Sequence, residues 1–292
     1  MDDGPMEGVK SAARWLARVL RRAANRLDVT VDTQTWVMKH PRRDMADDPD
    51  ERHYELQYLR WLEPFIAGLP SGATVLDLGC GYGRLALAIA GRRPDCAVVG
   101  VDHSPPSIRG ARAHAAERRL PNCRFEEADL AEFLSRQDEA SADLVLFVEV
   151  SFFAPRELGV LPQCARVLRP GAHLFGAFRS QWFNLVHSIV ARDLRSARIV
   201  CDARDGRLWG GGHRLWWQTP AEIQQAFTVA GLTMVAPCRG VGVLSALRED
   251  GVGLVQPASL SDEERSILLD LELSLAEAYA AQGRYIVGVG RK

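Results

Sequence analysis

The chain has 292 residues, of which 47% are hydrophobic and 25% are charged. This is ordinary globular composition, and it excludes disorder of the whole chain. The 36 lysines and arginines are balanced by 37 acidic residues, which leaves a net charge of -1. That balance excludes a protein that coats nucleic acid through its overall charge.

The cysteines and the apolar runs narrow the class further. The two nearest of the six cysteines, Cys80 and Cys96, are 16 positions apart, so there is no CxxC pair. We therefore predict reduced thiols, with neither a metal site nor a disulfide framework. No apolar run approaches the roughly 18 residues that span a bilayer. The acidic start lacks the apolar region of a secretory signal, which predicts a soluble cytoplasmic protein without a membrane span.

The first 65 residues favour helices. Residues 9–27 carry one lysine and five arginines without an acid, and apolar residues recur there at helical spacing. Such a helix could lie on an anionic membrane, on RNA or on its own domain, and we favour the last. A second helix over 54–65 ends near Gly68. We predict that residues 1–65 form an N-terminal helical lid in which Tyr54, Tyr58 and Trp61 close over a ligand.

Strands and helices alternate in the next segment. The apolar pattern predicts strands at 74–78, 97–101, 123–126, 143–150 and 173–178. Helices are predicted between them at 84–90, 108–119, 130–135 and 158–168. This alternation is typical of a parallel sheet with helices on both faces, so residues 66–180 are predicted to be an α/β core.

The alternation breaks after residue 180. Residues 196–202 and 213–218 are strand-like and flank glycine-rich turns, which predicts a β-hairpin within a cap over 181–218. Capping signals at Thr219 and Ser261 then start two helices, and strands are expected at 233–236 and 285–289. Residues 219–292 are thus predicted to complete the core with an extra helix. The span 237–283 could serve an acceptor or a dimer.

The strongest chemical signal follows the first predicted strand, where an acid precedes three alternating glycines. The segment runs Asp77-Leu78-Gly79-Cys80-Gly81-Tyr82-Gly83-Arg84. Arg84 stands where a dinucleotide fingerprint has its third glycine, so NAD is a poor fit. Asp102, 19 residues after Gly83, ends the second strand, and Asp129 follows the third. Acids at the carboxyl ends of three strands would repel phosphate and favour a neutral or cationic adenosine ligand.

At these residues the chain resembles the class I methyltransferases that use S-adenosylmethionine. Asp77, Gly79, Gly81, Gly83, Asp102 and Asp129 match the family's motif positions one by one. The resemblance covers residues 54–180 well and continues more loosely to the C-terminus. It implies a Rossmann-like α/β fold with a mostly parallel sheet of seven strands, the last of them antiparallel.

The resemblance also implies a role for each site residue. Asp77 would order the loop and meet the methionine amino group, while Gly79 and Gly81 let the backbone approach the cofactor. Asp102 would hold the ribose hydroxyls, with His103 beside the adenine. The adenine would donate to Asp129 and accept from the Leu130 amide. Glu149, at the end of the fourth strand, would lie near the methionine portion or act as a structural acid.

The acceptor is less constrained. The fourth strand ends in Glu149-Val150-Ser151-Phe152, without the signature of enzymes that methylate base amines, so nucleic acid is disfavoured. His213 and His187 are the candidate general bases for a hydroxyl acceptor. Aromatic side chains of the cap and its surroundings could line an apolar pocket: Trp182, Phe183, Trp216, Phe152 and Phe153.

We therefore predict transfer of a methyl group from S-adenosylmethionine to an O, N or C centre of a small molecule, in secondary or specialised metabolism. One alternative is an RNA or protein methyltransferase that uses the arginine face of residues 9–27. The other is a protein that binds the cofactor without transferring its methyl group. A homodimer is left open.

Overall fold

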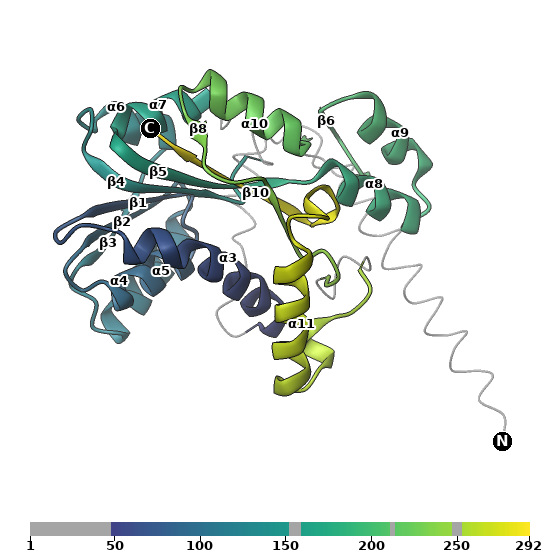
Figure 1. Cartoon of the computed structure of the whole chain (residues 1–292), viewed down its shortest axis with the longest axis horizontal. Coiled ribbons are helices and arrows are strands. Elements are labelled where there is room, and N and C mark those ends of the chain that lie inside the picture. Colours follow the sequence, from purple (N-terminus) through teal and green to yellow (C-terminus); the bar gives the residue numbers. More distant parts are fainter. Residues whose placement is uncertain (1–47, 152–158, 211–213, 247–252) are drawn as a thin grey trace.

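A computed structural model of the chain describes residues 48–151, 159–210, 214–246 and 253–292. Its centre is an eight-stranded sheet (Figure 1), in the order β3-β2-β1-β4-β5-β10-β8, with β9 also paired to β10. The strands are β1 (Thr74–Leu78), β2 (Ala97–Asp102), β3 (Cys123–Glu127), β4 (Ala142–Val148), β5 (Leu168–Arg179), β8 (Thr233–Met234), β9 (Arg239–Val241) and β10 (Tyr285–Arg291). β1 to β5 pair in parallel and β10 runs antiparallel to β5. The predicted Rossmann-like α/β class is confirmed.

The predicted count of seven strands is wrong, because the sixth strand is in two pieces. β8 pairs with one end of β10, where Met234 faces Gly290, and β9 pairs with the other end, where Val241 faces Tyr285. Pro237 lies between the two pieces. Proline has no amide to donate to a sheet, so the chain leaves the ladder there and rejoins it.

Helices cover both faces of the sheet (Figure 1). One face carries α3 (Pro49–Ala67), α4 (Arg84–Arg92) and α5 (Pro105–Glu117), and the other carries α6 (Leu130–Ser135), α7 (Leu161–Val167) and α10 (Pro220–Val229). Each face has its own apolar core. Tyr58, Leu62 and Ile66 of α3 are buried in the first core, so α3 is part of the packed domain. The rest of the predicted lid, residues 1–47, lies outside the described residues.

The capping signals are confirmed. Thr219 and Glu222 form a reciprocal capping box at the start of α10. Ser261 and Glu264 do the same for α11 (Asp262–Leu275). In each box the hydroxyl accepts from the third backbone amide while the glutamate accepts from the cap's own amide, which satisfies two donors that the helix cannot.

The segment after β5 is mostly helical. It forms α8 (Gln181–Val190) and α9 (Leu194–Asp202), which we call the α8–α9 hairpin, and then a short ladder of β6 (Asp205–Gly206) with β7 (Leu215–Trp216). The predicted β-hairpin is confirmed only in its second strand, since β7 lies within 213–218 but pairs with β6. The strand predicted at 196–202 is wrong, because those residues belong to α9. Ser196, Ala197 and Val200 are buried together there because they lie on one helical face. Asp193 caps that helix by accepting from the Ser196 amide.

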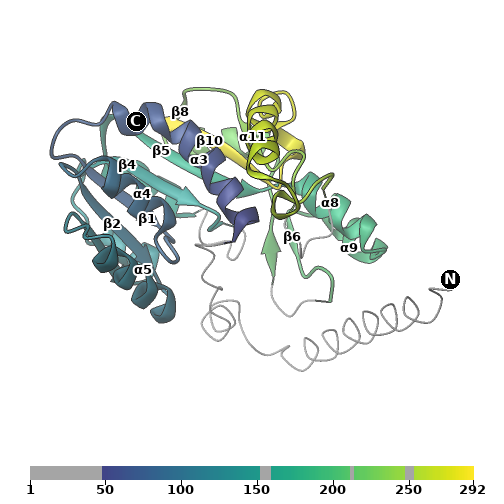
Figure 2. The same ribbon diagram turned by 90° about the horizontal axis from the view of Figure 1, so that it is seen from below.

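The span 237–283 holds α3 in place. It contains β9, α11 and two short 3-10 helices, Pro257–Ser259 and Ala280–Gln282, and α11 packs beside α3 (Figures 1 and 2). Glu272 of α11 is fully buried. Its carboxylate lies 2.6 Å from His53 Nε2, accepts from Gln57 Nε2 at 2.8 Å, and accepts from the amides of Leu244 and Ser245 at 2.8 Å. A buried carboxylate is tolerated when donors surround it in this way.

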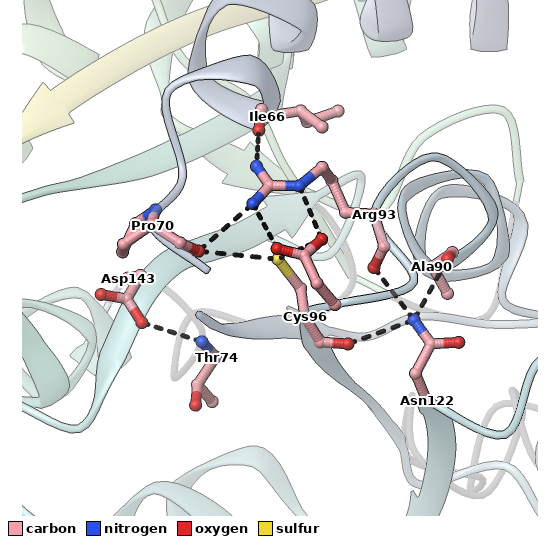
Figure 3. Close-up of polar contacts among 9 residues, drawn as sticks. Ile66, Pro70, Thr74, Ala90, Arg93, Cys96, Asn122 and Asp143 are labelled. Carbon is pink, nitrogen blue, oxygen red and sulfur yellow. Dashed lines mark hydrogen bonds and ion pairs between the residues drawn. The ribbon is translucent and has the colours of Figure 1, made fainter. Parts of the chain in front are cut away.

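Polar contacts close the amino edge of the sheet (Figure 3). The Arg93 guanidinium donates to the carbonyl oxygen of Ile66 at 2.7 Å and to that of Pro70 at 3.2 Å. The Asn122 amide nitrogen lies 3.1 Å from three carbonyl oxygens, one in the last turn of α4 and two in the loop that leads to β2. These contacts give hydrogen-bond donors to the backbone carbonyl groups at this edge. The candidate site residues gather at the opposite, carboxyl edge.

Candidate functional site

The glycine loop after β1 has one glycine that faces open space. Gly79, Gly81 and Gly83 all have left-handed backbones, with φ of 72°, 54° and 82°. A Cβ on Gly79 would lie 2.4 Å from Val150, and one on Gly83 would lie 2.6 Å from Phe125. A Cβ on Gly81 would meet nothing within 4 Å. Gly79 and Gly83 are therefore needed for packing as well as for the turn, while the backbone of Gly81 is open on the side where a Cβ would stand.

Asp102 joins this loop to the end of β2. Its Oδ2 accepts from the Gly81 amide at 2.9 Å, and its Oδ1 accepts from the Ser104 amide at 2.9 Å. His103 Nδ1 lies 3.7 Å from Asp102 Oδ1. Nε2 of the same ring is buried without a hydrogen-bond partner in the part of the chain that the structure describes. The structure thus brings Gly81, Asp102 and His103 together, as the sequence predicts, with one buried polar atom that has no partner among the described residues.

Asp77 lies beneath the loop, with a side chain that is 3% exposed. Its carboxylate accepts from the Ala86 amide at 3.2 Å in the first turn of α4. Burial raises the pKa of Asp77 to about 7, although the Ala86 amide and the charge of Arg84 both lower it. Asp77 therefore anchors the loop and is poised to change its protonation near neutral pH.

Asp129 and Leu130 lie at the end of β3, on the same edge of the sheet. Asp129 is exposed and caps α6, because its Oδ1 accepts from the amides of Ala131 at 2.9 Å and Glu132 at 3.1 Å. Leu130 begins the helix with its side chain buried. If Asp129 accepts from the adenine as predicted, the same carboxylate also caps α6.

Glu149 belongs to an ion network that the sequence does not reveal. Its Oε1 accepts from Arg84 Nη2 at 2.8 Å and from the Tyr58 hydroxyl at 3.0 Å. Arg84 Nη1 donates to Glu51 at 2.9 Å. Burial and the charge of Glu149 raise the pKa of Tyr58 well above its usual range. This network ties α3 to the glycine loop and to the end of β4.

The cap residues are placed in two different ways. The ring of His187 stacks on Trp209, with centroids 4.2 Å apart and planes at 23°, and Phe183 meets it edge-on at 6.0 Å. His187 thus takes part in packing within the cap. Trp182 is 49% exposed on the outside of α8. His213, Phe152 and Phe153 lie outside the described ranges, so their predicted roles stay predictions.

The fold and this carboxyl-edge site define a class of protein. Residues 75–171 match the family model described as a methyltransferase domain. This segment is a class I S-adenosylmethionine-dependent methyltransferase domain, and S-adenosylmethionine is the cofactor of that class.

Curated relatives match the same part of the chain. The ubiquinone biosynthesis O-methyltransferase of Acinetobacter baylyi is 31% identical over 117 residues, which are 40% of this chain and 48% of the relative. The trans-aconitate 2-methyltransferase of Methylobacterium nodulans is 39% identical over 106 residues, 36% of this chain and 38% of the relative. The chain therefore matches less than half of the length of either relative.

Solved structures extend the likeness to most of the chain. The magnesium protoporphyrin IX methyltransferase of Synechocystis PCC 6803, solved with bound S-adenosylmethionine, superposes with a TM-score of 0.54. The match covers 90% of this chain and 98% of that one at 13% identity. At such identity the likeness shows the fold alone.

Proposed function

We propose that this protein transfers a methyl group from S-adenosylmethionine to a small-molecule acceptor in secondary or specialised metabolism. The observation that carries the proposal is the pairing of Asp102 with the Gly81 amide beside open space. Each carboxylate oxygen of Asp102 accepts one backbone amide and keeps a lone pair for a ribose hydroxyl. His103 Nε2 and the Leu130 amide would meet the adenine, and Asp129 would accept from its amino group.

The bound cofactor supplies an electrophilic methyl group, and the protein's residues would orient the two reactants and exclude water. Asp77 would face the cofactor's ammonium group. Arg84 and Tyr58 hold Glu149 at the end of β4, where it would border the methionine portion. The acceptor would enter from the side of β5 and the cap, where the Arg179 guanidinium lies 4.3 Å from the ring centre of Phe183. His213 and His187 remain the candidate bases for a hydroxyl acceptor.

The names of the two curated relatives support a small acceptor, since one acts in ubiquinone biosynthesis and the other is named for trans-aconitate. The alternatives are an RNA or protein acceptor and cofactor binding without transfer. Strongly salt-dependent binding of a macromolecule would favour an RNA or protein acceptor. Cofactor binding without turnover across a broad acceptor panel would favour a binding protein.

The binding half of the proposal is tested by calorimetry with S-adenosylhomocysteine and NAD. We expect S-adenosylhomocysteine to bind and NAD not to bind. Asp102→Ala should weaken binding about 10- to 150-fold, because a charge-assisted hydrogen bond contributes about 1.5–3 kcal/mol. Glu127→Ala, at the exposed end of the neighbouring strand, is the matched control and should bind normally. Micromolar NAD binding without S-adenosylhomocysteine binding would contradict the proposal.

A further inference from the structure

The α8–α9 hairpin exposes large apolar side chains where its two helices meet. Ile189 is 50% exposed, Val190 is 55% exposed and Leu194 is 67% exposed. We call residues 189–195 the tip. In both ribbon views the hairpin lies at the end of the molecule opposite α4 and α5 (Figures 1 and 2). A cluster of this kind at a protruding end is typical of a contact surface.

The tip has a fixed backbone. The Asp193 amide donates to the Ser188 carbonyl and the Arg192 amide donates to the Ile189 carbonyl, both at 2.9 Å. These two bonds form the Schellman motif that ends many helices. Its left-handed position usually holds glycine, but here it holds Arg192 with φ of 55°. An arginine in this conformation costs about 1–2 kcal/mol. The end of α5 has the same motif, with Arg119 at φ of 54°.

The charge of the tip is positive. Arg192 and Arg195 are exposed, and neither forms an ion pair with another described residue. The one acid of the tip, Asp193, is used within the hairpin, because its oxygens accept from the amide and the hydroxyl of Ser196. The tip therefore presents apolar side chains between cationic ones.

We propose that the tip docks onto an anionic lipid bilayer. Apolar side chains flanked by arginines match the acyl boundary and the headgroups of such a surface. A second copy of this chain fits less well, since a two-fold contact would bring two copies of the same cationic patch into one interface. Residues 9–27 of the same chain also fit less well, because all of their charged side chains are cationic, like the exposed arginines of the tip. The contact is peripheral: no helix within the described ranges is long and apolar enough to cross a membrane.

The proposal goes beyond the methyl transfer and is tested apart from it, by co-sedimentation of the full chain with vesicles. We expect binding to vesicles of equal parts phosphatidylglycerol and phosphatidylcholine, and little binding to phosphatidylcholine alone. Leu194→Gln should weaken binding about tenfold or more, because it removes apolar burial. Arg195→Gln should weaken it about fivefold. Val229→Gln on α10, where the native side chain is 72% exposed, is the control and should bind as the wild type does.

Arg192→Gly separates docking from stability. Glycine fits the left-handed position better, so the unfolding temperature should stay level or rise while vesicle binding falls about fivefold. Binding that survives all three tip substitutions would overturn the proposal and assign the contact to another surface. So would the absence of binding, or a dimer in light scattering that the tip substitutions abolish.

Discussion

Asp77 is the site residue whose charge is most open to change. Its pKa of about 7 means that at pH 6 most molecules carry a neutral carboxyl group. The ammonium group of the cofactor favours the carboxylate, so the affinity for S-adenosylhomocysteine should rise with pH. From pH 6 to pH 8 we expect the affinity to rise about tenfold, because the ionised fraction of Asp77 rises about tenfold over this range. Calorimetry at several pH values measures this directly.

Asp77→Asn is the control for this prediction. Asparagine has no titration, so the affinity of the variant should vary little over the same range. Without ligand, native Asp77 keeps a proton that the unfolded chain releases at about pH 4. Compared with the variant, the wild type should therefore lose stability as the pH rises from about 4 to 7. A wild-type affinity that is flat with pH would show that Asp77 does not meet the ammonium group.

Arg84 shows why the sequence predicts which residues gather at the carboxyl edge better than it predicts the residues that support them. The sequence places Asp77, Gly81 and Asp102 in one site, because strand ends and glycine spacing are local signals. Arg84 has no such signal, since its partners Glu51 and Glu149 lie 33 and 65 positions away. In the sequence, Arg84 stands out only because it occupies the position of the third glycine in a dinucleotide fingerprint. The structure shows that it links α3 to β4.

Arg84→Met should destabilise the protein by about 3 kcal/mol, because it leaves a buried glutamate without its cation. The Arg84 side chain is 26% exposed, which places the loss at the lower end of such effects. Adding Glu149→Gln should recover much of the stability by removing the stranded charge. Urea unfolding of the two single variants and the double variant measures the coupling. Additive losses would mean that Arg84 and Glu149 stabilise the fold independently.

Among the elements, α9 shows where short apolar patterns mislead. Val200 and its neighbours satisfy a strand pattern over seven residues, and such short runs do not separate strands from helices. The deciding features are the Asp193 cap and the buried helical face formed with α8, which is a tertiary contact. Longer elements with caps at both ends, such as α10, were predictable to within a residue or two. The split of β8 from β9 depends on the single proline at 237.

The two candidate bases of the cap, His213 and His187, should respond differently to substitution. If His213 removes a proton from a hydroxyl acceptor, His213→Ala should slow the chemical step by roughly 10²–10⁴-fold and leave cofactor affinity unchanged. His187→Ala should act differently, because His187 packs against Trp209. We expect it to lower the unfolding temperature and to change turnover little once the protein is folded. Single-turnover kinetics with an acceptor that is already ionised should show no loss for His213→Ala. If only His187→Ala slowed the chemical step strongly, His187 would be the base and His213 would not.

At the scale of the whole molecule, the span 237–283 and α3 form one unit with the site. The sequence could not assign this span, because Glu272 meets its partners on α3 from more than 200 positions away: 219 for His53 and 215 for Gln57. Through Tyr58 the same helix reaches Glu149 at the carboxyl edge. Loosening the contact between α11 and α3 should therefore weaken cofactor binding, although Glu272 does not itself line the proposed site.

Glu272→Ala tests this link. It strands several buried donors, each of which costs about 1–3 kcal/mol when left unsatisfied, so the unfolding free energy should fall markedly. Hydrogen exchange should quicken in α3 and around residues 242–246 more than in β1 and β2. If the variant remains folded, its affinity for S-adenosylhomocysteine should fall, because Tyr58 no longer holds Glu149 in place. Asp270→Ala removes an exposed carboxylate from the same helix and should change none of these quantities. Faster exchange spread evenly over the sheet would mean that Glu272 supports the whole core and not α3 in particular.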